Sequence, residues 1–211
     1  PSLRCSQVVA NLLRPLRIFA SFQQASANDW EQRTFSELYR SISEKNDLSF
    51  GTDRIISVAT MKFNPETVVS DREYLLTYNV MRVGDVAFEG HPNKEFSHGR
   101  FVENDIGDGI VSHIFAVFRP NAPYDLRYWK YAINNERLMR DALVRSTKAS
   151  TMMHDLVASD FLSESIPVPS LPEQSRIGSL FQKLDSLIAL HQRELEILKN
   201  LKKAMLEKIF V

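Results

Sequence analysis

Ser170-Leu171-Pro172-Glu173-Gln174 opens the stretch that decides the fold, which continues as SRIGSLFQKLDSLIALHQRELEILKNLKKAMLEKIF to Phe210. The Ser-x-x-Glu spacing is that of a capping box, and a proline is tolerated in the first turn of a helix. No proline follows that turn, and no glycine follows Gly178. The stretch therefore predicts one long helix over residues 170–211.

Apolar side chains recur along this helix at intervals of three and four residues for more than four heptads, as in a coiled coil. At about 1.5 Å per residue the helix is roughly 55–60 Å long, which a single domain of this size cannot bury. We therefore expect a partner helix, from this chain or another. Two polar positions interrupt the seam: they either set its register or, for Lys202, only snorkel to solvent. The seam comprises Ile177, Phe181, Leu184, Ile188, His191, Leu195, Leu198, Lys202, Met205 and Ile209.

The rest of the chain predicts one globular domain over residues 29–169, preceded by residues 1–28. That leader has three arginines and no acid, and we expect it to be poorly ordered. Strand-like segments are followed by a helix over 125–144, a polar loop over 146–153 and a stiff boundary at Pro167-Val168-Pro169. The strand-like segments are 54–60, 79–82, 84–89 and 109–119. The fold class is α+β, with a mixed or antiparallel sheet and helices ahead of the long helix.

Composition excludes several classes of protein. Cys5 is the only cysteine, so no intramolecular disulfide forms, and a reducing cytoplasm is expected. No apolar run approaches the roughly 20 residues that span a bilayer. The net charge is zero, but residues 29–172 hold 16 Lys and Arg against 21 Asp and Glu. If this domain binds DNA, its basic groups must gather on one face, or a partner must supply phosphate contacts.

Motifs of nucleotide-binding, dinucleotide-binding, hydrolase and zinc-protease enzymes are missing: G-x-x-x-x-G-K-[ST], G-x-G-x-x-G, G-x-S-x-G and H-E-x-x-H do not occur. The Asn/Asp-Pro-Pro-aromatic tetrapeptide of amino-methyltransferases is also missing. The best candidate metal ligands are Asp85, Glu89, His91 and His98, since carboxylates and imidazoles are usable donors. A metal-dependent nuclease built on these four residues is an alternative function.

Between two strand-like segments, residues 89–104 interleave hydrogen-bond donors with aromatic residues. Lys and Arg reach guanine or phosphate, Asn can pair with adenine, and Ser or His can contact either purine. The simpler interpretation is a solvated loop whose Phe96 and Phe101 enter the core. A second donor-rich segment lies at 145–148. The candidate base contacts are Asn93, Lys94, Ser97, His98 and Arg100, with Arg145 and Lys148 as secondary contacts.

Three segments carry a family resemblance. Residues 29–33 (DWEQR), 84–113 and 167–174 (PVPSLPEQ) resemble specificity subunits of type I restriction–modification systems. Ile177-Gly178, Leu184-Asp185, Leu187-Ile188 and His191-Gln192-Arg193 extend the likeness along the helix. It runs from about Asp29 to Phe210. The Pro-Glu-Gln junction before a long heptad helix is its most specific part.

The resemblance implies a non-catalytic DNA-specificity protein. Such subunits have two recognition domains, each of which reads one half of a bipartite DNA site in the major groove. Two antiparallel helices set the spacing and dock methyltransferase subunits. S-adenosylmethionine, ATP and Mg are expected only on partner subunits, and restriction subunits join through the complex.

This sequence has one recognition domain and one long helix, so we expect a half-subunit that forms a homodimer through residues 174–210. Residues 1–28 match nothing in the family. A coiled-coil interaction protein with no DNA role is a further alternative.

Overall fold

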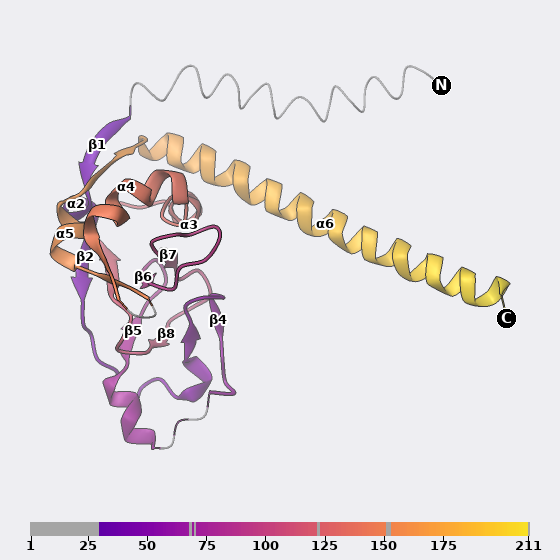
Figure 1. The fold of residues 1–211 in the computed structure, drawn as a ribbon, viewed down its shortest axis with the longest axis horizontal. Coiled ribbons are helices and arrows are strands. Elements are labelled where there is room, and N and C mark those ends of the chain that lie inside the picture. Colours follow the sequence, from indigo (N-terminus) through magenta and orange to yellow (C-terminus); the bar gives the residue numbers. More distant parts are fainter. Residues whose placement is uncertain (1–29, 68, 70, 122, 151–152, 211) are drawn as a thin grey trace.

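The computed structural model describes residues 30–67, 69, 71–121, 123–150 and 153–210, so the predicted leader at 1–28 lies outside the described residues. It confirms an α+β fold followed by a long helix. The strands pair antiparallel, and α6 (Leu171–Ile209) projects away from the globular part (Figure 1). None of the helices in the described part of the chain is long and apolar enough to cross a membrane.

The centre of the domain is an antiparallel sheet in the order β2-β9-β6-β7. Its strands are β2 (Tyr39–Ile42), β9 (Val117–Pro120), β6 (Val86–Glu89) and β7 (Arg100–Glu103). Successive side chains of a strand point to opposite faces. Val86 and Phe88 accordingly face one hydrophobic cluster, while Ala87 between them faces another. The sheet is therefore buried on both faces, which explains why its inner strand β6 is almost wholly apolar.

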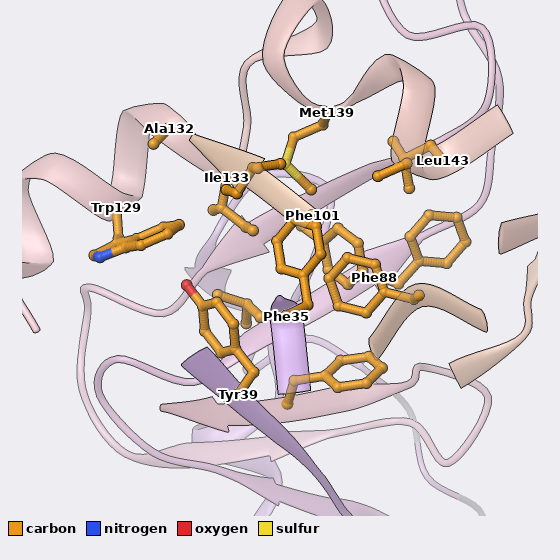
Figure 2. Close-up of a cluster of buried hydrophobic side chains, with 14 of the residues drawn as sticks. Phe35, Tyr39, Phe88, Phe101, Trp129, Ala132, Ile133, Met139 and Leu143 are labelled. Atoms are coloured by element: carbon orange, nitrogen blue, oxygen red, sulfur yellow. The ribbon is translucent and has the colours of Figure 1, made fainter. Parts of the chain in front are cut away.

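Helices cover the first face (Figure 1). They are α2 (Phe35–Leu38), α3 (Leu126–Ala132), α4 (Glu136–Ser146) and α5 (Ala158–Ser163). Phe161 of α5 lies among sheet and helix aromatics, with ring centroids 4.2 Å from Phe35 and 4.4 Å from Phe101. Figure 2 shows this cluster, in which Phe101 and Tyr39 point toward Trp129, Ile133 and Met139. Aromatic packing here fixes α3, and α3 in turn carries α6.

Short β-pairs complete the domain. β3 (Ile56–Ser57) pairs with β4 (Lys62–Phe63), and β5 (Asn79–Met81) pairs with β8 (Gly109–Val111). Two 3-10 helices, Thr52–Arg54 and Arg72–Thr77, lie in the connections. β1 (Glu31–Thr34) pairs with β12 (Ser165–Val168), so the two ends of the domain meet just before α6 begins.

Two predicted strands were wrong in extent. The strand predicted over 109–119 is two strands, β8 and β9, in different sheets. The backbone N–H of Phe115 donates to the Ser112 carbonyl and turns the chain between them. Likewise the strand predicted over 54–60 shrinks to β3, because a 3-10 helix ends at Arg54 and a turn follows Ser57.

The helix predicted over 125–144 is also divided, into α3 and α4. The Asn135 side chain caps α4 by accepting a hydrogen bond from the Leu138 N–H at 2.9 Å. A side-chain oxygen at this position stabilises the start of a new helix. The apolar spacing nevertheless continues across the break, and for this reason the sequence predicted one helix. The polar loop predicted over 146–153 begins with β10 (Thr147–Ala149), which pairs with β11 (His154–Leu156).

The capping box at the start of α6 is confirmed. Glu173 accepts hydrogen bonds from the Ser170 backbone N–H at 3.1 Å and from the Ser170 hydroxyl at 2.8 Å. The first part of α6 then packs against α3. Gly178 lies so close that a Cβ there would be 2.6 Å from the Tyr128 nitrogen. Phe181 packs on Tyr131 with ring centroids 5.0 Å apart, and the Tyr131 hydroxyl donates to Asp185 at 2.6 Å.

Candidate nucleic-acid interface

The first donor-rich segment forms the loop 90–99 between β6 and β7. The Asn93 side-chain oxygen accepts hydrogen bonds from the Glu95 and Phe96 N–H groups, at 2.8 and 2.9 Å. Phe96 is buried, whereas Lys94 between them is exposed. The side-chain carbonyl of Asn93 therefore stabilises the loop, and Lys94 is the exposed cation of the loop. Phe96 and Phe101 both enter the core, as the simpler interpretation of the sequence predicts.

Arg100, predicted as a base contact, is engaged inside the protein. Its Nε donates to Glu89 at 2.9 Å, and its Nη2 donates to the Ala59 carbonyl at 2.7 Å. The guanidinium also lies 5.1 Å from the centre of the Phe96 ring, and the side chain is only 20% exposed. Arg100 thus ties β6, β7 and the β3–β4 turn together, so its loss would disturb structure as well as any DNA contact.

The second donor-rich segment divides in the same way. Arg145, near the end of α4, makes a bidentate ion pair with Glu164, with its Nε donating at 2.8 Å. This pairing raises the pKa of Arg145 above its ordinary value. Lys148 is exposed on β10, and within the described residues neither it nor Lys94 lies in an ion pair. The two lysines are therefore the predicted cations best placed to meet a phosphate or a base.

The structure brings the two segments together. The backbone N–H of His154, on β11, donates to the Gly90 carbonyl at 2.8 Å. The rings of His98 and His154 lie 5.3 Å apart, and Ser97 shares a hydrogen bond of 2.8 Å with His98 Nδ1. We call the loop 90–99 together with β10 and β11 the recognition face. His154 was not among the predicted residues, because only this tertiary contact brings it beside His98.

Beside the recognition face, a cleft of about 1220 Å³ lies between β7, the β3–β4 turn, α3 and the start of α6. Its cations are Arg100, Lys130 and Arg137, and Lys130 is paired with Asp105 at 2.6 Å. Glu103 lines the cleft yet is only 3% exposed. Burial raises the pKa of Glu103 to about 8, against the effect of a hydrogen bond from the Tyr124 hydroxyl. This carboxyl is therefore mostly protonated at neutral pH.

The four candidate metal ligands are not gathered. Asp85 is buried and accepts two hydrogen bonds from Arg119, both at 2.9 Å. Glu89 pairs with Arg100, and His98 is bonded to Ser97. Only His91 approaches Glu89, at 3.9 Å. Among the described residues no group of three or more potential ligands could hold a metal ion, so the metal-dependent nuclease has no support.

The second part of α6 is exposed on all sides. Ten large apolar residues between Leu187 and Ile209 are 46–66% exposed. All of them except Leu206 fall into two adjacent heptad stripes about 100° apart on the helix. The first stripe continues the predicted seam through Ile188, Leu195, Leu198, Met205 and Ile209; the second comprises Leu187, Leu190, Ile197 and Leu201. The first seam positions, Ile177 and Phe181, instead contact the domain.

Comparison with known proteins places the chain among DNA-specificity proteins. A family model described as the type I restriction modification DNA specificity domain matches residues 28–200. The chain is 24% identical over 199 residues to a protein named as the MjaX specificity subunit of a type I restriction enzyme, from Methanocaldococcus jannaschii. That match covers 86% of this chain and 45% of the relative.

Two further proteins agree. The MjaVIII specificity subunit of the same organism is 24% identical over 159 residues, covering 75% of this chain and 32% of the relative. The HsdS subunit from Thermoanaerobacter tengcongensis has a similar fold, with a TM-score of 0.51, 19% identity and coverage of 78% of this chain and 44% of that one. The chain thus spans less than half the length of these relatives.

Proposed function

The chain belongs to the family of type I restriction–modification DNA specificity domains, and we propose that it reads one half of a bipartite DNA site for a methyltransferase complex. The family match carries this proposal. The domain's surplus of acidic residues would not suggest DNA binding by itself. The recognition face makes the proposal specific: exposed Lys94 lies on the same loop as His98, and exposed Lys148 lies on β10, the strand paired with β11.

We further propose that the chain is non-catalytic and contributes recognition alone. The family match supports this role. The carboxylates of Asp85 and Glu89 are paired with Arg119 and Arg100 rather than gathered with histidines around a reaction centre. S-adenosylmethionine, ATP and Mg would bind methyltransferase and restriction subunits. The methyltransferase would also supply much of the phosphate contact, which offsets the negative charge of this domain.

The exposed stripes of α6 suggest how the complex assembles. A helix with one apolar stripe needs one partner, whereas two adjacent stripes are typical of a helix that packs against two neighbours. We assign the Ile188–Ile209 stripe to the α6 helix of a second copy of the chain, giving a homodimer. The Leu187–Leu201 stripe would then dock the methyltransferase subunit. Light scattering at micromolar concentration tests the first assignment, and a monomer would contradict it.

The experiment that tests the function is co-purification of the chain with its methyltransferase subunit, followed by sequencing of the methylated DNA. One bipartite methylated sequence is expected. DNA affinity should be weak for the chain alone and much tighter for the complex. Equal affinities with and without the methyltransferase, or methylation without sequence preference, would contradict the proposal.

Four substitutions separate DNA contacts from structural residues. Lys94→Ala and Lys148→Ala should weaken DNA binding and leave thermal unfolding unchanged, because both side chains are exposed. If either lysine contacts a phosphate, the slope of log affinity against log salt falls by about 1. Arg100→Ala should instead lower the unfolding temperature, since it removes the link to Glu89 and Ala59. Arg72→Ala, in the 3-10 helix outside the recognition face, is the matched control.

A further inference from the structure

The recognition face depends on a close approach of two segments that lie far apart in the sequence. Gly90 is buried, and a Cβ on it would lie 2.1 Å from the His154 carbonyl oxygen and 3.3 Å from the His154 nitrogen. Any side chain at this position would therefore push β11 off the loop. The hydrogen bond from His154 N–H to the Gly90 carbonyl fixes the same contact from the other side.

This contact sets the position of His98. The His98 and His154 rings meet edge to face at 5.3 Å, with an angle of 62° between their planes. His98 Nδ1 is occupied by the hydrogen bond with Ser97, and the Ser97 hydroxyl in turn donates to Glu136 at the start of α4, at 3.3 Å. The ring of His98 is thus held by the loop, by α4 and by β11, and its Nε2 is the nitrogen left for a ligand.

His154 is placed differently. Its Nδ1 is buried, and no hydrogen-bond partner for it exists among the described residues. A buried nitrogen without a partner costs free energy, and the contact that the structure gives this ring is its packing against His98. The exposed Lys94 lies on the same loop as His98, and Lys148 lies on the strand paired with β11.

We infer that the loop 90–99 and the β10–β11 pair act as one base-reading element, in which His154 and Gly90 position His98 against duplex DNA. The inference rests on the proposed function and adds a positioning residue to it. Two independent loops would each tolerate changes in the other. In a composite element, a substitution in the loop and a substitution in the β10–β11 pair should have the same effect on base preference, because each displaces the His98 ring.

The test uses the complex of the chain with its methyltransferase subunit and a pool of DNA duplexes that share a randomised central segment. The bound duplexes are sequenced for the wild type, for His98→Ala and His154→Ala, and for the double variant. Both single variants should relax preference at the same base positions, by roughly 5- to 150-fold if His98 makes a full base contact. The double variant should be no worse than His98→Ala, because the two residues act through one contact.

Two further variants separate positioning from folding and from direct contact. His154→Phe keeps the packing ring and removes the unpartnered nitrogen, so it should keep the wild-type base preference. Gly90→Ala should resemble His154→Ala, while Gly51→Ala is the control, since a Cβ there meets only the end of the Asp53 side chain at 2.9 Å. Thermal unfolding of each complex monitors the fold.

The outcomes distinguish this inference from the proposed function. A wild-type complex that enriches no sequence contradicts the function itself. A wild-type complex that enriches a sequence, with His154→Ala giving the same profile, overturns the inference alone. It is also overturned if His154→Phe loses preference as His154→Ala does, because His154 would then contact DNA through its own nitrogens.

Discussion

Residues 171–185 and 186–209 of α6 belong to one uninterrupted helix with one apolar rhythm, yet they have different surroundings. In the first part, Ile177 and Phe181 pack on the domain, and Gly178 permits close contact with α3. In the second part, residues with the same spacing are about half exposed. A heptad pattern therefore states that a helix needs a partner, and only the tertiary structure tells which positions already have one.

The difference has an energetic meaning. Fully burying a leucine or isoleucine side chain contributes about 1.5–3 kcal/mol, so several half-exposed residues in two stripes leave a large favourable term unused. In the docked part of α6, apolar side chains gain this free energy by packing against α3 of the same chain. The exposed part can bury its apolar side chains only against another molecule. The stability of this part of α6 should therefore depend on protein concentration.

The largest expected effect comes from charging the exposed stripe. Leu195→Glu with Leu198→Glu would place two carboxylates in the proposed homodimer contact, where burial without a partner is costly. We expect complete loss of the dimer in light scattering at micromolar concentration, with the circular dichroism of the domain retained. A dimer that survives would show that this stripe is not the contact.

A matched control adds the same charge elsewhere on the same helix. Ala189→Glu with Gln192→Glu introduces two carboxylates on the polar side of α6, outside both stripes. The dimer should persist in this variant. If both double variants dissociate it, general charge repulsion and not the seam explains the effect.

A second prediction concerns the environment beside the docked part of α6, where Glu103 lines the cleft with Ile177 and Phe181. Burial raises the pKa of Glu103 from 4.5 to about 8. Between pH 4.5 and pH 8, the folded state therefore keeps a proton that the unfolded state has released. The stability that this group contributes is therefore lost as pH rises from about 4.5 to 8, and the loss reaches about 3 kcal/mol by pH 7.

Glu103→Gln stays uncharged and can still accept the Tyr124 hydrogen bond. Denaturant unfolding should show no difference from wild type below about pH 4.5 and a growing advantage of Glu103→Gln as pH rises to 8. A constant difference across this range would mean that Glu103 does not titrate as inferred. Because Glu103 lies within one chain, the effect should be independent of protein concentration, unlike that of the leucine pair.

The third prediction tests the junction between the two parts. Gly178→Ala would normally strengthen a helix by roughly 0.5–1 kcal/mol. Here its Cβ would lie 2.6 Å from the Tyr128 nitrogen and 2.8 Å from two Arg127 atoms, so α6 must shift. Overpacking of this kind costs about 1–3 kcal/mol, to be measured by denaturant unfolding. Ser186→Ala, just beyond the junction, should have little effect.

The elements that the sequence predicted well are those with strong local signals. The capping box at Ser170 and Glu173 and the length of α6 depend on residues a few positions apart, and both are confirmed. The strand over 109–119 failed because apolar residues continue through the turn at Ser112–Phe115. The helix over 125–144 failed because Asn135 caps a second helix without interrupting the apolar spacing.

The candidate site was predictable as a set of residue types but not as an arrangement. Lys94 and Lys148 are exposed, as a contact residue should be. Arg100 and Arg145 instead pair with Glu89 and Glu164, and no local sequence pattern indicates either pairing. Nothing local relates Gly90 to His154. A hydrogen bond between segments more than fifty residues apart follows from the packing of α4 and β11 against the sheet, which no periodicity encodes.

The smallest expected effect lies at the start of the docked part. Ser170→Ala removes the hydroxyl that donates to Glu173 at 2.8 Å and so breaks the capping box of α6. Loss of an N-cap side chain costs typically about 1 kcal/mol. Denaturant unfolding should show this loss at every protein concentration, while the dimer dissociation constant stays unchanged, because the capping box lies at the opposite end of α6 from the exposed stripes. A change in dissociation without a change in unfolding would instead mean that the first turn of α6 takes part in the dimer, and that the two parts of the helix are not separate in function.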